Sequence, residues 1–161
     1  MNRRNLLLLA TGLAGAAIMP RFFAKAKTMD TAFEINRPES EWRSRLTPAQ
    51  FAVLRGHGTE PAGSSPLDKE HRKGIFACAG CDLPLFHSES KFDSGTGWPS
   101  FTAPIDGAVG TSTDRTLLLF VRTEVHCRRC GGHLGHVFED GPEPTGLRYC
   151  MNGVALKFSP A

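Results

Sequence analysis

Two stretches decide the fold of this chain: ACAGC at residues 77–81 and HCRRCGG at residues 126–132. Each holds a Cys-x-x-Cys pair beside glycine, which permits the tight turn that directs two thiolates at one ion. Two redox-active pairs, or an iron site of the rubredoxin type, could use the same residues. The βαβ context of a thioredoxin-like redox motif is absent, so we favour zinc. We expect one structural zinc ion bound by Cys78, Cys81, Cys127 and Cys130.

The remaining pattern predicts an α+β domain that is mainly β. Residues 39–56 favour two short helices, the second with Thr47 as N-cap and Pro48 at its first position. Residues 57–73 are rich in Gly, Pro and Ser and predict a long loop. Short apolar runs then alternate with glycine and proline, which is typical of antiparallel strands. These runs are residues 74–77, 83–87, 117–122, 133–139, 147–152 and 154–158.

The first residues predict an export signal over residues 1–26. Arg3 and Arg4 precede an apolar run at residues 6–18 that is short for a membrane span. The arginine pair resembles a twin-arginine (Tat) signal, and small residues allow cleavage after Ala26. A Sec signal or an uncleaved signal that tethers the chain to the membrane is the alternative. We expect a periplasmic protein with a flexible linker at residues 27–38 and one domain at residues 39–161.

The net charge of +3 belongs to this signal. Four of the 19 basic residues lie in residues 1–26, whereas all 16 acidic residues follow them. The remaining chain is nearly neutral and shows no basic stripe, so we expect no nucleic-acid partner.

The fifth cysteine stands apart, in GLRYCMN at residues 146–152. In a strand, Arg148, Cys150 and Asn152 would share one face. A cation on that face lowers the pKa of a thiol and favours the thiolate. The pattern therefore indicates a nucleophile, with an inert buried cysteine as the alternative.

Two further motifs contain candidate site residues. His133 and His136 follow the second cysteine pair, and an imidazole there could act as a general acid or be an ordinary core or surface residue. Strand alternation would put the two histidines on opposite faces, so a turn is needed if both reach one site. Trp98, in the glycine-rich residues 93–101, could be a packing residue or a flat apolar wall for a small substrate group.

Together these blocks resemble the methionine-R-sulfoxide reductase B family (peptide-methionine (R)-S-oxide reductase). The resemblance covers about residues 36–158 and implies two packed antiparallel sheets with short N-terminal helices, the Mss4-like or MsrB-type β fold. The blocks that carry it are both cysteine pairs and residues 92–101, 121–125, 131–138 and 148–152.

The resemblance also implies the chemistry. It makes Cys150 the nucleophile that reduces methionine R-sulfoxide through a sulfenic acid, in the repair of oxidised proteins under oxidative stress. Asp140 would support the second histidine. Trp98 and Phe101 would bind the substrate, and the catalytic surroundings of the nucleophile would be His133, His136, Arg148 and Asn152.

One departure from the family pattern concerns recycling. Many members carry a resolving cysteine where Thr96 lies here, and residues 61–71 also differ from the usual segment. We therefore expect a monomer whose partners are oxidised proteins or peptides and an external thiol reductant such as a thioredoxin-like protein. Two rival readings are a zinc-ribbon module that binds a protein partner and a zinc-stabilised lyase that acts on thiol adducts.

Overall fold

The computed structural model describes residues 33–115 and 121–161. These residues belong to one compact unit, Thr31–Ala161. The predicted export signal and most of the apolar run at residues 117–122 lie outside them. Within the described ranges, none of the helices combines the length and the apolar character that a membrane crossing requires.

Two short helices precede the sheets, as predicted: α1 (Glu39–Arg45) and α2 (Pro48–Leu54). Thr47 caps α2 by accepting a hydrogen bond from the Gln50 N–H, while the Gln50 side chain accepts one from the Thr47 N–H. This reciprocal capping box satisfies two donors that the helix start leaves free. Single turns of 3-10 helix lie at η1 (Pro66–Lys69), η2 (Ser88–Ser90) and η3 (Gly153–Ala155).

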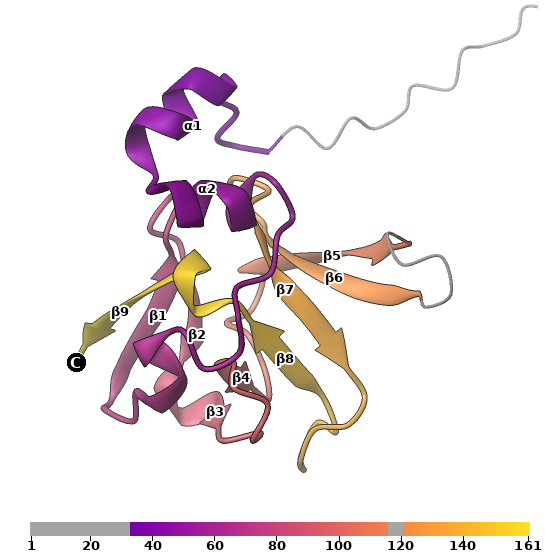
Figure 1. The fold of residues 1–161 in the computed structure, drawn as a ribbon. Coiled ribbons are helices and arrows are strands. Elements are labelled where there is room, and N and C mark those ends of the chain that lie inside the picture. The colour runs from indigo at the N-terminus through magenta and orange to yellow at the C-terminus, as the bar shows by residue number, and fades with distance from the viewer. Residues whose placement is uncertain (1–32, 116–120) are drawn as a thin grey trace, which may run out of the picture. The chain divides into compact units, whose positions relative to one another are not determined.

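The strands form two antiparallel sheets (Figure 1), which confirms the predicted fold class. The first sheet has the order β2-β1-β9, and the second has the order β3-β4-β8-β7-β6-β5. The strands are β1 (Gly74–Cys78), β2 (Pro84–His87), β3 (Lys91–Phe92), β4 (Ser100–Phe101), β5 (Val109–Asp114), β6 (Arg122–Cys127), β7 (His133–Phe138), β8 (Arg148–Met151) and β9 (Leu156–Pro160).

Aromatic side chains join the two sheets. Phe101 on β4 stacks on Phe86 of β2, with ring centroids 4.2 Å apart, and meets Phe76 of β1 edge-on at 5.0 Å. All three are fully buried. The helices cover one end of this core through Trp42, Leu46, Val53 and Leu54. The sequence predicted Phe101 as a substrate-binding residue, but the structure places it in this core.

The described part of the predicted flexible linker contacts the domain. The Ile35 N–H donates to the Arg129 carbonyl at 2.9 Å, and the Ile35 side chain packs against the core. Residues 33–37 therefore lie against the second cysteine pair, because an apolar side chain and a backbone hydrogen bond hold them there.

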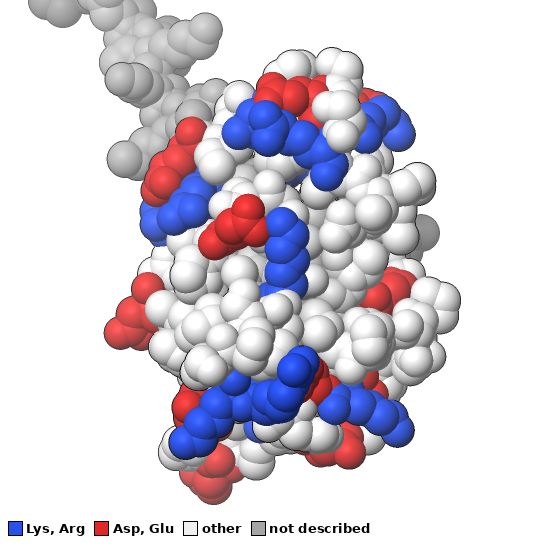
Figure 2. All heavy atoms as spheres, turned by 90° about the vertical axis from the view of Figure 1, so that its left-hand side faces the viewer, with Lys and Arg blue, Asp and Glu red and all other residues white. Residues whose placement is uncertain are grey.

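The surface in Figure 2 mixes charges of both signs. Basic side chains lie beside acidic ones on this face. Ion pairs on the surface include those of Arg72 with Glu70 and of Lys157 with Asp82. Along the lower part of this face, Lys and Arg side chains form a row with Asp and Glu side chains among them.

Candidate functional site

Four cysteine sulfurs gather where the two sheets meet. Cys78 ends β1 in the first sheet and Cys127 ends β6 in the second, and each brings its Cys-x-x-Cys partner with it. All four sulfurs lie within 4.8 Å of one another. The cluster thus connects the sheets at their ends through residues far apart in sequence. Its members are Cys78, Cys81, Cys127 and Cys130.

The sulfur separations fit a tetrahedral metal. Tetrahedral zinc with Zn–S bonds of about 2.3 Å requires sulfurs about 3.8 Å apart. The Cys78–Cys130 and Cys81–Cys127 pairs lie 3.8 and 3.5 Å apart. Hydrogen bonds among the sulfurs raise the pKa of Cys78 and lower that of Cys127, so the group ionises only in part unless a cation neutralises it. The four cysteines could therefore hold one metal ion.

Cys150 occupies a different setting, in the middle of the second sheet. It is half-buried on β8, directly opposite Ser100 of β4 and His136 of β7. It opens into a cavity of about 130 Å³. The rings of Trp98 and Phe138 give this cavity two aromatic walls. It is lined by Thr59, Trp98, Arg122, Gly135, His136, Phe138, Cys150 and Asn152.

Burial raises the pKa of the Cys150 thiol, and polar neighbours oppose this effect. The Arg148 charge and hydrogen bonds from the hydroxyls of Thr96 and Ser100 lower the pKa. Ser94 connects these hydroxyls, with its Oγ 2.8 Å from each. Arg148 therefore acts in the expected direction, but desolvation outweighs it and the net shift is upward.

A β-bulge in β7 brings the two histidines to one face. The register places Gly135 opposite Val125 but His133 opposite His126, so Leu134 is an extra residue. A bulge of this kind reverses the alternation of side chains. The rings of His133 and His136 consequently lie 5.3 Å apart. The turn that the sequence analysis required is this bulge.

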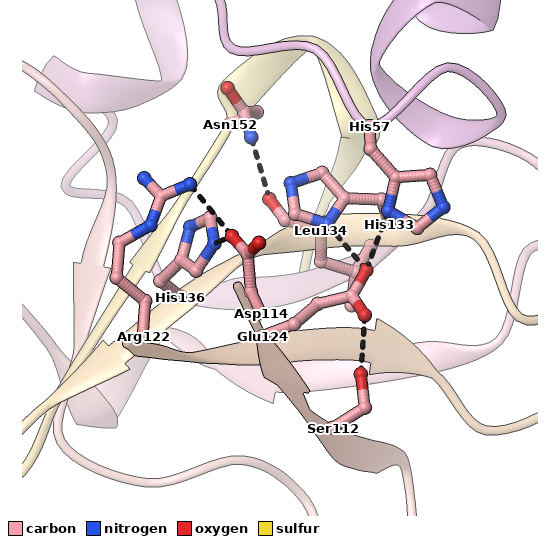
Figure 3. A network of polar contacts seen from close by, with 9 residues as sticks. All are labelled: His57, Ser112, Asp114, Arg122, Glu124, His133, Leu134, His136 and Asn152. Carbon is pink, nitrogen blue, oxygen red and sulfur yellow. Dashed lines mark hydrogen bonds and ion pairs between the residues drawn. The ribbon is translucent and has the colours of Figure 1, made fainter. Parts of the chain in front are cut away.

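His136 faces the cavity and is held by a carboxylate. Its Nε2 lies 2.7 Å from Asp114 Oδ2, which also pairs with Arg122 Nη2 at 2.7 Å (Figure 3). Asp140, which the resemblance placed beside this histidine, instead forms a bidentate ion pair with Arg148 at 2.8 Å. The support for His136 thus comes from β5.

His133 lies behind His136 in a second polar group (Figure 3). Its Nδ1 is 2.7 Å from Glu124 Oε1, and His57 Nδ1 is 3.0 Å from the same oxygen. Burial lowers the pKa of His133. Burial raises the pKa of Glu124, but hydrogen bonds from Ser112 and His133 outweigh it, so this pKa is lowered overall. His133 is therefore a neutral imidazole beside an ionised carboxylate.

Glu60 holds the long loop against the segment that follows β8. Its carboxylate accepts hydrogen bonds from the N–H groups of Gly153 and Val154 at 2.6 and 2.9 Å. Its own N–H donates to Asn152 Oδ1 at 2.9 Å, and its carbonyl accepts from Trp98 Nε1 at 3.1 Å. One residue thereby fixes both an aromatic wall of the cavity and the amide of Asn152.

Glycine is needed where β7 passes Cys150. A Cβ at Gly135 would lie 2.1 Å from the Cys150 carbonyl oxygen, a distance that no side chain can occupy. The backbones of β7 and β8 thus lie too close together beside Cys150 to admit a side chain at residue 135.

The structure brings most of the predicted site residues to one cavity. Cys150, His136, Trp98 and Asn152 line it, and Arg148 acts on the thiol from its edge. His133 and Phe101 are not among the lining residues. Sequence reasoning missed five contributors: Thr59, Glu60, Asp114, Arg122 and Phe138. Arg122 and Phe138 lie in blocks that carry the resemblance, whereas the segments of the other three carried no motif signal.

Comparison with known proteins adds a family match. A profile described as "SelR domain" matches residues 46–160. The peptide methionine sulfoxide reductase MsrB of Agrobacterium fabrum is 51% identical over 131 residues, covering 81% of this chain and 96% of that protein. The MsrB of Leptospira interrogans is 50% identical, covering 78% of this chain and 96% of that protein. Peptide methionine sulfoxide reductase B1, chloroplastic, of Arabidopsis thaliana is 50% identical, covering 75% and 60%.

Proposed function

This chain belongs to the SelR-domain (MsrB) family of peptide methionine sulfoxide reductases, and from that premise we propose that it reduces the R epimer of methionine sulfoxide with Cys150 as nucleophile. It is an oxidoreductase that acts on a sulfur group. One observation carries the proposed mechanism: the Cys150 thiol and the His136 imidazole are cross-strand neighbours at the same small cavity.

The cavity suits the end of a methionine sulfoxide side chain. Its volume of about 130 Å³ admits a methyl group and the sulfoxide but little more. Trp98 and Phe138 supply apolar area for the methyl group, while His136 and Asn152 supply polar groups for the oxygen. An asymmetric arrangement of this kind selects one epimer.

The proposed reaction begins with attack of the Cys150 thiolate on the sulfoxide sulfur. His136 donates a proton to the sulfoxide oxygen, and Asp114 stabilises the protonated imidazole before this transfer through its hydrogen bond. The S–O bond and the newly formed S–S bond then break as the hydroxyl is transferred to the Cys150 sulfur. Methionine leaves two electrons richer, and Cys150 becomes a sulfenic acid, two electrons poorer.

The sulfenic acid is reduced by an external thiol. The other four cysteines lie together in the metal cluster, and Thr96 takes the place of a resolving cysteine. The incoming thiol condenses with the sulfenic acid, which releases water and forms a mixed disulfide. A second external thiol attacks that disulfide and restores the Cys150 thiol. A thioredoxin-like protein is a suitable donor class.

The cysteine cluster holds one structural zinc ion in this proposal. Cys78, Cys81, Cys127 and Cys130 would supply its whole coordination shell, so the ion supplies folding energy and takes no part in the reaction.

Localisation and role complete the proposal. The chain acts as a monomer that repairs oxidised proteins or peptides during oxidative stress. It is exported to the periplasm by a Tat signal cleaved near Ala26, or it is tethered by that signal if cleavage fails. Replacing Arg3 and Arg4 with lysine should retain the chain in the cytoplasm, and unchanged export in cell fractionation would contradict the Tat assignment.

The decisive test of function offers each sulfoxide epimer in a short peptide, with a dithiol reductant. The R peptide should be consumed and the S peptide left intact. Cys150→Ser should lower turnover by at least about a thousandfold. The variant should retain its metal, and turnover by Cys150→Ser would refute the assignment.

A further inference from the structure

We propose that His57, Glu124 and His133 form a second metal site, separate from the cysteine cluster, that takes a divalent first-row transition-metal ion. The argument starts from ligand convergence. Nδ1 of His57 and Nδ1 of His133 both face Glu124 Oε1, at 3.0 and 2.7 Å. All three ligand atoms lie within 4.8 Å of one another. Ligands about 2.0–2.2 Å from a zinc-like ion lie at comparable separations.

The three side chains are held in place from several directions. Ser112 Oγ donates to the second oxygen of Glu124 at 2.5 Å, which fixes the carboxylate plane. The ring of His57 lies 5.2 Å from that of His133 with a tilt of 36°. The His133 side chain is 2% exposed and that of Glu124 is 12% exposed. Figure 3 shows both imidazoles directed at this carboxylate.

His57 reaches the group from an unusual backbone position. It has a φ of +54°, a region that non-glycine residues enter rarely. Its imidazole is therefore turned toward Glu124 by the end of α2, although most of the side chain is exposed. Residues held in such conformations gather at binding and catalytic sites.

The proton inventory favours metal binding. One carboxylate oxygen can accept hydrogen bonds from both Nδ1 atoms only if both carry protons. A divalent cation bound at the two Nδ1 atoms would take the place of those protons, each imidazole would carry its proton on Nε2 instead, and all three ligands would stay in contact.

The donor set indicates which ions fit. Two imidazoles and one carboxylate suit Zn²⁺, Fe²⁺, Co²⁺, Ni²⁺ or Cu²⁺ better than Mg²⁺ or Ca²⁺, which prefer oxygen ligands. The group borders a second cavity of about 260 Å³, where water could complete the shell. Asp114 and the guanidinium groups of Arg122 and Arg115 also line this cavity, and the Glu124 carboxylate offsets the one positive charge that these three leave in excess.

The test is a titration of the full-length, zinc-loaded chain with Co²⁺. One additional Co²⁺ should bind per chain, with weak visible absorption and no sulfur-to-cobalt charge-transfer band, because the ligands contain no thiolate. Equilibrium dialysis gives the stoichiometry. No added binding at millimolar Co²⁺, or a sulfur charge-transfer band alone, would overturn the proposal.

Variants locate the bound ion. His57→Gly removes one ligand and suits the positive φ, and it should weaken Co²⁺ binding at least about tenfold. Glu124→Gln should weaken it as well, and circular dichroism checks that the variant folds. His71→Gly, in an exposed loop, is the matched control and should bind as the parent does. Equal affinity in His57→Gly and His71→Gly would exclude this site. Because the readout is binding, the outcome is independent of the proposed reductase activity.

Discussion

The cysteine cluster and the surroundings of Cys150 place the same side chain in two opposite settings. In the cluster, each sulfur has other sulfurs as its nearest polar neighbours, at 3.5 and 3.8 Å in the two measured pairs. Cys150 instead has the hydroxyls of Thr96 and Ser100 and the guanidinium of Arg148 as polar neighbours. It lies opposite His136 on β7 and borders a cavity. The difference teaches that neighbours decide whether a thiol takes a structural or a chemical role.

The two settings also differ in what supports them. The cluster depends on two tight glycine-flanked turns that carry their own ligands. The Cys150 site draws residues from β5, β6, β7, β8 and the loop at residues 57–66. Local sequence therefore suffices to form the cysteine cluster. The Cys150 site depends on the register of the second sheet and on the loop at residues 57–66.

The largest expected effect is loss of the fold, when a cysteine of the cluster is replaced. Cys127→Ser removes one cluster ligand and should release the metal. Structural zinc supplies roughly 10–16 kcal/mol of apparent binding free energy in small domains, comparable with the whole stability of a domain. Cooperative thermal unfolding followed by circular dichroism should disappear. Cys150→Ser is the matched control and should keep both the metal and the cooperative unfolding transition. Equal metal loss in both variants would contradict the assignment of separate structural and reactive cysteines.

A smaller effect is expected at the loop that supports the Cys150 site. Glu60→Gln weakens the hydrogen bonds to the Gly153 and Val154 N–H groups and so loosens the loop that holds Trp98. Hydrogen bonds to charged groups contribute about 1.5–3 kcal/mol, so kcat/KM should fall roughly 10- to 100-fold.

Steady-state kinetics on a sulfoxide peptide measures this fall, and Trp98 fluorescence reports the local change. Glu139→Gln changes an exposed carboxylate and serves as the control. Kinetics in Glu60→Gln equal to those of the parent chain would show that the loop around Glu60 does not position Trp98.

A third change gives the reactive thiol a sulfur neighbour of the kind found in the cluster. Thr96 lies within hydrogen-bonding reach of Cys150. Thr96→Cys should therefore form an internal disulfide after one turnover without reductant, seen as the loss of two hydrogens by mass spectrometry. Thr111→Cys, on the far strand β5, should form none. Absence of the Thr96→Cys bond would place the two side chains farther apart than the structure does.

The smallest expected effect concerns the reactivity of Cys150 itself. Burial raises its pKa, so the thiol form dominates at neutral pH. Alkylation by iodoacetamide should accelerate as pH rises through and beyond the ordinary thiol range, since only the thiolate reacts. Arg148→Met removes a charge that lowers the pKa and should slow alkylation at neutral pH. A rate that is flat with pH, or unchanged by Arg148→Met, would show that burial and Arg148 do not control the thiol.

Sequence reasoning found the parts of this molecule whose information is local. The Thr47–Pro48 helix start, the cysteine pairs and the run around Cys150 were all recognisable because spacing alone specifies them. The strands β3 and β4 are too short to show an alternation of apolar and polar residues in the sequence. They exist because Phe101 is packed between the sheets, which also explains why a residue expected at the substrate lies in the core.

The carboxylate partners could not be read in the same way. Asp140 is close to His136 in sequence, yet Asp114 holds it, because β6 and β7 are cross-strand neighbours and β5 follows β6 at the edge. Glu60 was equally inconspicuous, as it lies in an irregular loop. Such contacts depend on strand order, which no single segment encodes.

The extra residue in β7 also bears on how the two histidines are held. Because Leu134 is an extra residue that bulges from β7, the three-residue spacing from His133 to His136 still places both imidazoles on one side of the sheet. Leu134 is fully buried, and its carbonyl accepts hydrogen bonds from the backbone N–H and the side-chain amide of Asn152. The residue that aligns the two imidazoles is therefore anchored to the segment that follows Cys150, so the alignment of the histidines depends on this contact as well as on the length of β7.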